Sequence, residues 1–585
     1  MMDTKQTKRC NGAGIPDKGR LLRCFYRQIR EGNFMKKTWT PDADLVIRNA
    51  RIYTVALTID EVRQGKYDFP IYENSFVAAK DGKTIAVGEG DGATFIGSAT
   101  EVIDAGGKTL VPGLIDSHMH ALFAGKEMLG VELSGAATRE EFIQRIAEHA
   151  AKTPAGKWVK GAGWNEMIWP DGKMPTRYDL DQVVPDHPAY FIRLCHHVYV
   201  ANSKALAAAG ITRDTPDPLG GMIGRDETGE PNGLLYENAA MNLMDDVAPA
   251  MTEDELIDAI AGVGRVMNGF GLTACIDCNL PFDEMRSYLQ AKKRGRLTYR
   301  ADLMFYLEKA WGDMPYHLQR IKEMVCVTGF GDDMLKMNGV KVTLDGIPAT
   351  GTAAMREPYD HMPETKGDTL YTPEQMREMG ELAGKYHWQI GLHCCGDRTA
   401  DVAMDAFETA YAAAGNRDAR HYIIHLGIAQ PDQIPRLKAL DVPVATQPTI
   451  GLQMGEQPVL GERLASRYML CGSLLREGII VGGSTDCPVV TCNPFEGMYA
   501  AVTRLGADGK VYLPQEAVTP AQALIMWTKN SAYFLHADDR MGSIEPGNLA
   551  DYALIDTPIL TASPDEIRST RVLKTFVGGK TVYET

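Results

Sequence analysis

Two histidines separated by one residue follow an apolar, strand-like run. The run Val111-Pro112-Gly113-Leu114-Ile115-Asp116 leads directly into Ser117-His118-Met119-His120. Because side chains alternate along a strand, His118 and His120 project from the same face. Two imidazoles on one face can bind a divalent metal such as Zn²⁺. The pair therefore predicts a metal site, with ordinary core or surface histidines as the alternative.

Residues of ligand type recur at the ends of later strand-like runs. His393 ends Gly391-Leu392-His393, His425 ends Ile423-Ile424-His425, and Asp486 follows Gly483-Ser484-Thr485. In a barrel of parallel strands, the carboxyl ends of all strands meet at one mouth. The recurrence thus predicts one centre that contains four histidines and a carboxylate.

The elements that must position these side chains follow the alternation of βαβ units. Apolar strand-like runs alternate with amphipathic helical stretches, which is typical of a parallel sheet covered by helices. We predict a (β/α)8 TIM barrel of the α/β class, with strands near residues 110–118, 272–278, 298–307, 335–344, 389–393, 421–425, 442–447 and 479–486. The stretch after the first strand is far longer than a βα loop of about 2–6 residues, so 121–249 is predicted to be an inserted subdomain.

Short β-prone runs with glycine-rich turns occupy both ends of the chain. Residues 35–110 and 540–585 are expected to pair as one small β-sandwich of antiparallel strands, and 111–539 to form the barrel with its insertion. Residues 1–34 are basic and lack the apolar stretch of a secretory signal, so we expect a disordered leader, with Met35 as an alternative start.

Composition excludes several partners. The chain has 585 residues, a formal net charge of −15 and eleven scattered cysteines. The negative charge disfavours nucleic acid, and no apolar run approaches the ~20 residues of a membrane span. An odd number of cysteines in a long chain favours reduced thiols, so we expect a cytoplasmic protein with a small-molecule substrate.

From about Asp44 to the C-terminus, the sequence resembles the metal-dependent amidohydrolase superfamily, specifically its family 3, which includes N-substituted formamide deformylases. Besides the histidines and Asp486, the resemblance includes Met337-Asn338-Gly339-Val340-Lys341-Val342-Thr343-Leu344-Asp345-Gly346, Gly396-Asp397-Arg398, Gln447-Pro448 and Pro546-Gly547-Asn548-Leu549-Ala550-Asp551. One departure is the sequence around the sixth-strand histidine, Ile424-His425-Leu426-Gly427, where many relatives have Glu before the histidine and Ala-Gln after it. A changed environment of this imidazole is expected to tune the metal or the substrate preference.

The resemblance implies one or two divalent metals, with zinc expected. The implied metal residues are His118, His120, Lys341 as a carboxylated lysine, His393, His425 and Asp486. For Lys341, an ion pair with Asp345 is the alternative, and Lys336 is a weaker substitute. Asp486 is the implied general base and acid in hydrolysis of a C–N bond other than a peptide bond, in a linear amide or an N-substituted formamide. The alternatives are a deaminase of a C=N-containing small molecule and a catalytically silent regulatory relative.

Substrate contacts are expected from Trp164 and His197 of the insertion and from Arg398. Packing is an equal interpretation for Trp164 and the favoured one for Trp169, and an ion pair of Arg398 with Asp397 or Asp401 is an equal interpretation for that residue. The cysteines near the barrel mouth are expected to be buried and inert, with metal or redox roles as the alternative. The resemblance also implies a possible homo-dimer, since members of the superfamily often form one.

Overall fold

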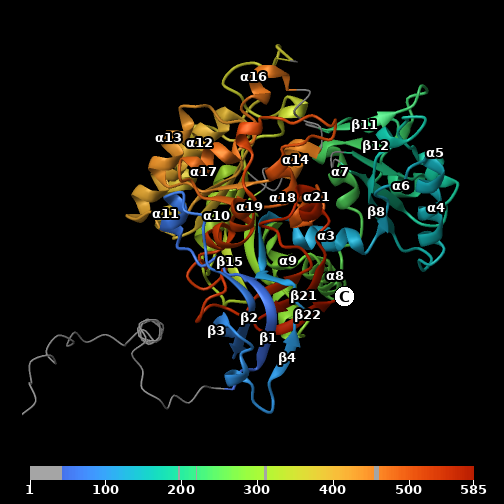
Figure 1. Cartoon of the computed structure of the whole chain (residues 1–585). Coiled ribbons are helices and arrows are strands. Elements are labelled where there is room, and N and C mark those ends of the chain that lie inside the picture. Colours follow the sequence, from blue (N-terminus) through green and yellow to red (C-terminus); the bar gives the residue numbers. More distant parts are fainter. Residues whose placement is uncertain (1–41, 195–197, 219–220, 308–312, 361, 454–459) are drawn as a thin grey trace, which may run out of the picture.

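The computed structural model describes residues 42–194, 198–218, 221–307, 313–360, 362–453 and 460–585. The predicted leader 1–34 and the predicted substrate contact His197 both lie outside the described residues. Three sheets organise the described chain (Figure 1).

A barrel of eight parallel strands forms the centre. In sheet order its strands are β6 (Leu114–Met119), β13 (Leu272–Leu280), β14 (Arg300–Leu307), β15 (Leu335–Thr343), β16 (Gln389–Cys394), β17 (Tyr422–His425), β18 (Val444–Thr446) and β19 (Val481–Gly483). Most of their residues are buried, as expected for strands covered on both faces. The predicted (β/α)8 barrel is confirmed, and every predicted strand overlaps an observed one.

Helices cover the outside of the barrel between successive strands. The longest are α8 (Glu253–Gly269), α9 (Phe282–Lys293), α11 (Pro373–Lys385) and α12 (Asp397–Ala414). Helix α8 begins at a capping box in which Thr252 accepts from the Glu255 N–H while the Glu255 carboxylate accepts from Thr252. Its buried face, which includes Ile257, Ile260 and Val263, packs into the barrel core. No helix in the described parts of the chain has the length and apolar character needed to cross a bilayer.

The barrel closes between its last and first strands through hydrogen bonds near their carboxyl ends. Ser117 Oγ donates to the Gly483 carbonyl at 3.0 Å. Further along both segments, the Asp486 N–H donates to the His118 carbonyl at 2.9 Å, and the His120 N–H donates to the Cys487 carbonyl at 2.8 Å. The junction of β19 with β6 therefore holds the predicted metal residues of both strands side by side.

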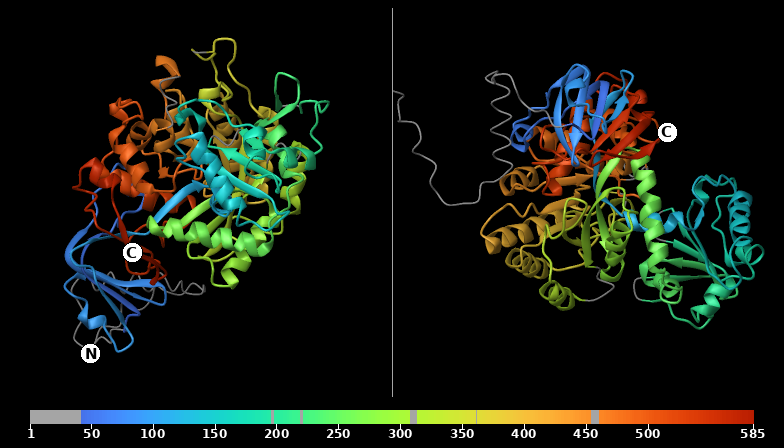
Figure 2. Two further views of the ribbon diagram at one scale, coloured as in Figure 1. Left: turned by 90° about the vertical axis from the view of Figure 1, so that its right-hand side faces the viewer. Right: turned by 90° about the horizontal axis from the view of Figure 1, so that it is seen from below.

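The two ends of the chain join in one sheet below the barrel (Figures 1 and 2). Its path is β22 (Lys580–Glu584), β21 (Val572–Val577), β20 (Tyr552–Ile555), β5 (Thr109–Pro112), β1 (Leu45–Tyr53), β2 (Ile71–Lys80) and β3 (Lys83–Glu89), with β4 (Glu101–Asp104) also on β1. The ends pair as expected, antiparallel between β5 and β20. The expectation of purely antiparallel strands was wrong, because β1 pairs with β4 and β5 in parallel.

The predicted first barrel strand is divided in two. Pro112 ends β5 in the terminal sheet and Leu114 begins β6 in the barrel. Gly113 lies between them, where an added Cβ would lie 2.2 Å from Thr273 Oγ1. Only glycine allows this close approach, so Gly113 marks the point where the chain leaves one sheet for the other.

The long stretch after β6 carries a sheet of its own beside the barrel (Figure 2). Its strands are, in order, β11 (Met222–Arg225), β12 (Pro231–Tyr236), β10 (Val198–Ala201), β9 (Ala189–Arg193), β8 (Val159–Trp164) and β7 (Val131–Glu132). Buried residues such as Phe142, Trp164 and Phe191 form a separate core under this sheet. The exact domain boundaries given above stay a prediction.

Candidate metal centre

Three predicted ligands meet where the barrel closes. His118 Nε2 lies 3.0 Å and His120 Nε2 2.9 Å from Asp486 Oδ1. His118 is fully buried, and Asp486 is nearly so. Two ligands at about 2.1 Å from one Zn²⁺ lie roughly 3 to 3.5 Å apart in a tetrahedral site. The spacing of these three atoms therefore suits a single metal ion.

Two of the site residues have unusual backbone conformations. Asp486 has a φ of 61° and His425 a φ of 74°, in the left-handed region that residues other than glycine rarely adopt. Such conformations cost about 1–3 kcal/mol and cluster at functional sites. His425 ends β17, and Asp486 lies three residues after the end of β19, so the turn of the backbone sets the direction of each side chain at the barrel mouth.

The later histidines extend the cluster. The His425 ring centroid lies 5.4 Å from that of His118 and 4.5 Å from that of His393. His425 Nδ1 donates to Gln447 Oε1 at 2.7 Å, and Gln447 Nε2 in turn donates to Ser484 Oγ. Gln447 thus supplies the orienting contact that the changed sequence around His425 put in question.

His393 lies between a carboxylate and a thiol. Its Nδ1 is 3.3 Å from Asp345 Oδ1, and its Nε2 is 3.7 Å from Cys395 Sγ. Asp345 also accepts from the N–H groups of Cys395 and Gly396 and from Thr399 Oγ1. The structure therefore places Asp345 with His393 and the start of α12, whereas the alternative interpretation had paired it with Lys341.

Lys341 lies on β15 inside the barrel with 2% of its surface exposed. Burial lowers the pKa of its ammonium group, and the groups that act against this shift include Cys278, Asp486 and Cys395. Lys341 therefore faces the same cluster. A lysine with a lowered pKa is more readily the neutral amine that reacts with carbon dioxide, so its position suits the carbamate that the resemblance implies.

The charges of the cluster fit a bound cation. Burial lowers the pKa of His118 to about 3 and that of His425 well below its ordinary value, so both imidazoles are neutral. Burial alone would raise the pKa of Asp486, but the adjacent His118 and His120 lower it well below its ordinary range. Among the described residues, the buried atoms His118 Nε2, His393 Nδ1 and Asp486 Oδ1 have no hydrogen-bond partner. Neutral nitrogens facing a carboxylate oxygen without a proton between them are a donor set for a divalent metal.

Two buried aspartates, to which the sequence alone assigned no role, accept hydrogen bonds from the segments that carry the candidate ligands. Asp116 accepts from the His118 N–H at 3.1 Å and from Thr485 Oγ1 at 2.6 Å, which ties β6 to the segment that carries Asp486. Burial raises the pKa of Asp116 to about 7. Asp277 accepts from the N–H groups of Ala121 and Leu122. Asp116 stands in the quoted motif, but its role depends on contacts with a distant segment.

The predicted substrate contacts have mixed outcomes. Trp164 is fully buried, and its Nε1 donates to the Phe191 carbonyl at 3.1 Å, so its surroundings favour packing. Arg398 pairs with Asp368 at 2.8 Å. The alternative ion pair of Arg398 with Asp397 or Asp401 is wrong, because Arg398 pairs with Asp368 instead. Asp397 accepts from the Arg356 main-chain N–H, and Asp401 pairs with the Arg356 guanidinium.

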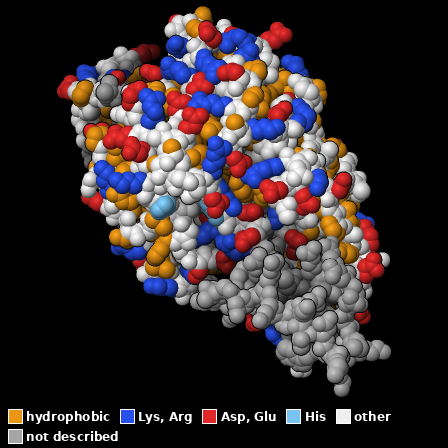
Figure 3. Space-filling view, turned by 90° about the vertical axis from the view of Figure 1, so that its left-hand side faces the viewer, with side chains coloured by type: hydrophobic (Ala, Val, Ile, Leu, Met, Phe, Trp, Pro, Cys, Tyr) orange, Lys and Arg blue, Asp and Glu red, His pale blue; other side chains and the backbone are white. Residues whose placement is uncertain are grey.

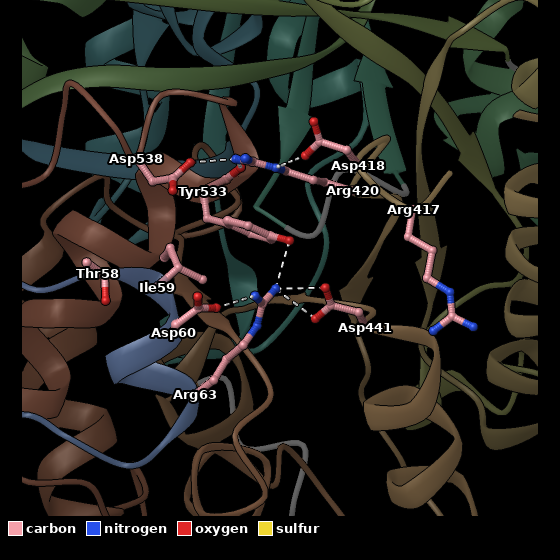
Figure 4. Close-up of a pocket in the computed structure, with 10 residues that line it drawn as sticks. All are labelled: Thr58, Ile59, Asp60, Arg63, Arg417, Asp418, Arg420, Asp441, Tyr533 and Asp538. Carbon is pink, nitrogen blue, oxygen red and sulfur yellow. Dashed lines mark hydrogen bonds and ion pairs between the residues drawn. The ribbon is translucent and has the colours of Figure 1, made fainter. Parts of the chain in front are cut away.

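The eight cysteines within the described residues form no disulfide, and all but Cys326 are buried. A surface pocket of about 430 Å³ opens elsewhere, at the amino ends of β17 and β18 (Figure 4). There Arg63 pairs with Asp441 at 2.8 Å and Arg420 with Asp538 at 2.6 Å, on either side of Tyr533. His425 lies at the carboxyl end of β17, whereas this pocket lies at the amino end. The pocket is therefore separate from the candidate metal centre.

The family model described as the amidohydrolase family matches residues 101–583. The chain belongs to this family, whose members are metal-dependent hydrolases.

Individual relatives agree over most of their length. The chain is 30% identical to N-substituted formamide deformylase of Arthrobacter pascens over 83% of this chain and 90% of that protein. It is also 30% identical to protein LONG AFTER FAR-RED 3 of Arabidopsis thaliana, over 94% of this chain and 93% of that protein. A solved structure of an uncharacterized metal-dependent hydrolase from Pyrococcus horikoshii has the same fold, with a TM-score of 0.72, 24% identity, and coverage of 89% of this chain and 99% of that one.

Proposed function

We propose that this chain hydrolyses a C–N bond other than a peptide bond, in a small linear amide or N-substituted formamide. The observation that carries the proposal is the contact of His118 Nε2 and His120 Nε2 with one carboxylate oxygen of Asp486, at 3.0 and 2.9 Å. The similarity to N-substituted formamide deformylase supports the substrate class.

Six residues would hold one or two divalent ions, with zinc as the proposed metal. They are His118, His120, Lys341 as its carbamate, His393, His425 and Asp486. Imidazole nitrogens and carboxylate-type oxygens are the donors that Zn²⁺ prefers in hydrolytic sites. When bound, the metal supplies Lewis acidity, which makes water nucleophilic at neutral pH and polarises the scissile carbonyl.

Asp486 would move the proton. Its carboxylate is ionised and lies at the barrel mouth, so it can accept the proton of the attacking water. The same carboxyl group then donates this proton to the leaving nitrogen, which departs as a neutral amine. One residue thus acts first as a base and then as an acid.

Substrate recognition is proposed for Arg398 and for His197. Arg398 is the second residue of α12, and among the described residues one side-chain carboxylate, that of the largely exposed Asp368, pairs with it. A substrate carboxylate can exchange with such an exposed partner at little cost, because exposed ion pairs contribute only about 0–1 kcal/mol.

We further propose a cytoplasmic enzyme that acts as a homo-dimer and has no nucleic-acid partner. The cysteines of the described residues, which form no disulfide, support a reducing compartment. Lys/Arg and Asp/Glu side chains are interspersed on the face that Figure 3 shows, which suits a protein without a phosphate-binding patch.

The test combines metal content with a substrate screen. The purified protein is expected to contain one or two metal ions per chain and to lose activity with a chelator and regain it with Zn²⁺. A panel of N-substituted formamides and linear amides is then scored for carboxylate and amine products. Ammonia released without a carboxylate product would favour a deaminase, and less than one metal per chain after Zn²⁺ supplementation would favour a catalytically silent regulatory protein.

A further inference from the structure

We infer that Cys278 is a positioning residue of the metal centre, because its thiol determines which ring nitrogen of His118 carries the proton. The inference rests on the proposed metal-binding function and deepens it. Cys278 lies on β13 and is 1% exposed, next to the first strand of the barrel.

The thiol has a contact on each side. Cys278 Sγ lies 3.1 Å from His118 Nδ1 and 3.6 Å from Met304 Sδ. Met304 on β14 is fully buried and also accepts a hydrogen bond from the Tyr422 hydroxyl at 2.8 Å. A row of polar and sulfur groups therefore crosses the barrel interior from His118 to Tyr422.

The thioether allows one direction of this row that suits a metal ligand. Met304 Sδ carries no hydrogen, so it can only accept, and the Cys278 thiol can donate its hydrogen to it. The sulfur lone pairs of Cys278 then face His118 Nδ1, and the ring proton of His118 lies on Nδ1 in this contact. This tautomer leaves the lone pair of Nε2 facing Asp486 Oδ1, and it is the tautomer that a histidine ligand needs when Nε2 binds a metal.

The same residue orients the second histidine through its backbone. His120 Nδ1 lies 3.3 Å from the Cys278 carbonyl oxygen, so a donated N–H leaves the lone pair of His120 Nε2 facing Asp486 as well. The two ligands of the first strand thus depend on one residue, one through a side chain and the other through the main chain. Only the first contact is removed by substitution at position 278.

A metal-binding histidine normally donates a hydrogen bond from its second ring nitrogen. Removal of the group that accepts this bond typically weakens metal binding by about 10- to 100-fold. Here that group is a neutral thiol, where carboxylates and carbonyls are usual. Alanine at this position would leave the His118 Nδ1–H buried without an acceptor. The proton would then move to Nε2 at little cost, and the imidazole would lose the lone pair that faces Asp486.

The experiment measures metal affinity in Cys278→Ala, Cys278→Ser and Cys275→Ala. Cys275 lies on the same strand and is equally buried, and within the described part of the chain its thiol has no hydrogen bond to a candidate metal residue, so Cys275→Ala controls for a cavity in β13. We expect Cys278→Ala to weaken Zn²⁺ and Co²⁺ binding by about 10- to 100-fold. Cys278→Ser, which keeps an acceptor, should recover most of the affinity, and Cys275→Ala should bind like the parent protein.

The visible spectrum of the Co²⁺-loaded protein gives a readout independent of activity. We expect Cys278→Ala to change the d–d bands and Cys278→Ser to keep the parental pattern. A parental spectrum and affinity in Cys278→Ala would overturn the inference while leaving the proposed function intact. A sulfur-to-cobalt charge-transfer band that disappears in Cys278→Ser would also overturn it, by making Cys278 a ligand. A parent protein that binds no metal would instead sink the proposed function itself, and this inference with it.

Discussion

The Asp486 N–H donates to the His118 carbonyl at 2.9 Å, while the side chains of the same two residues meet at 3.0 Å between Oδ1 and Nε2. The main-chain bond joins the segment after β19 to β6 and so closes the barrel. The side-chain contact forms the heart of the candidate metal centre. The same two residues therefore contribute both to the closure of the barrel and to the candidate metal centre.

Replacement of Asp486 by asparagine should separate metal binding from proton transfer. The amide keeps an oxygen in place but cannot accept a proton at neutral pH, so kcat should fall by about 10²- to 10⁴-fold on the best substrate of the screen. Metal content, measured by atomic emission, should stay close to that of the parent protein. Turnover near the parental rate with metal bound would remove Asp486 from the proposed mechanism.

Gln447 should affect metal affinity because it orients the imidazole of His425. Gln447→Leu removes the acceptor at 2.7 Å from His425 Nδ1 and should weaken metal binding by about 10- to 100-fold. Gln447→Glu retains an acceptor for this N–H and is the matched variant, expected to hold metal at least as well as the leucine variant. Equal affinity of the leucine variant and the parent protein, in competition with a metal indicator, would show that this contact does not orient the ligand.

Trp164 should affect stability more than catalysis. Trp164→Ala removes a fully buried side chain that packs on Phe142 with a ring-centroid distance of 6.2 Å. Large-to-small changes of this kind cost about 3–5 kcal/mol, so the insertion should unfold at lower denaturant concentration. KM for the best substrate should change little in protein that remains folded. A large rise in KM with unchanged stability would instead restore the substrate-binding interpretation.

Stability should decrease in mild acid because two histidines far from the metal centre are buried as neutral rings. Burial lowers the pKa of His421 to about 3 and that of His536 to about 4. In the unfolded chain both would titrate near 6.5, so the unfolded state binds more protons below that pH. The contribution of these two neutral rings to the free energy of unfolding is complete above about pH 6.5. As the pH falls from 6.5 toward 4, each ring lowers the free energy of unfolding by up to about 1.4 kcal/mol per pH unit.

Denaturant midpoints at pH 7.5 and 5.5 measure this loss. His421→Gln removes one titrating group and keeps an acceptor for the Ile390 N–H, which His421 Nδ1 accepts at 3.1 Å. The variant should show a smaller difference between the two midpoints than the parent protein. The same difference in both proteins would mean that His421 does not carry this pH dependence.

The barrel strands were predictable because each is an apolar run that is buried on both faces, bounded by turn residues. The break at Gly113 was not, since the run from Leu110 to Ile115 is continuously apolar. What divides it is pairing of β5 with β20 from the other end of the chain, a contact that local pattern does not encode. Parallel pairing of β1 escaped prediction for the same reason.

At the candidate site, too, some residues could be predicted from the sequence and others could not. The candidate ligand residues could be named from their chemical type and their place at or after the ends of strands, and their binding of metal stays a prediction. The groups that orient them were not, because Asp345, Gln447 and Cys278 contact histidines on neighbouring strands. Which partner each side chain meets depends on register and on the direction of the side chain, as the pairing of Arg398 with Asp368 also shows.

The sheet shared by both chain ends has a consequence for synthesis. Strands β20, β21 and β22 leave the ribosome after every barrel strand, yet β20 is the antiparallel neighbour of β5, and only Gly113 separates β5 from the strand that carries His118. A nascent chain thus contains all the candidate ligands before the strand that braces the first two has emerged. A product that stops short of residue 552 would lack this antiparallel neighbour of β5, so we expect it to hold His118 and His120 less firmly than the full chain does.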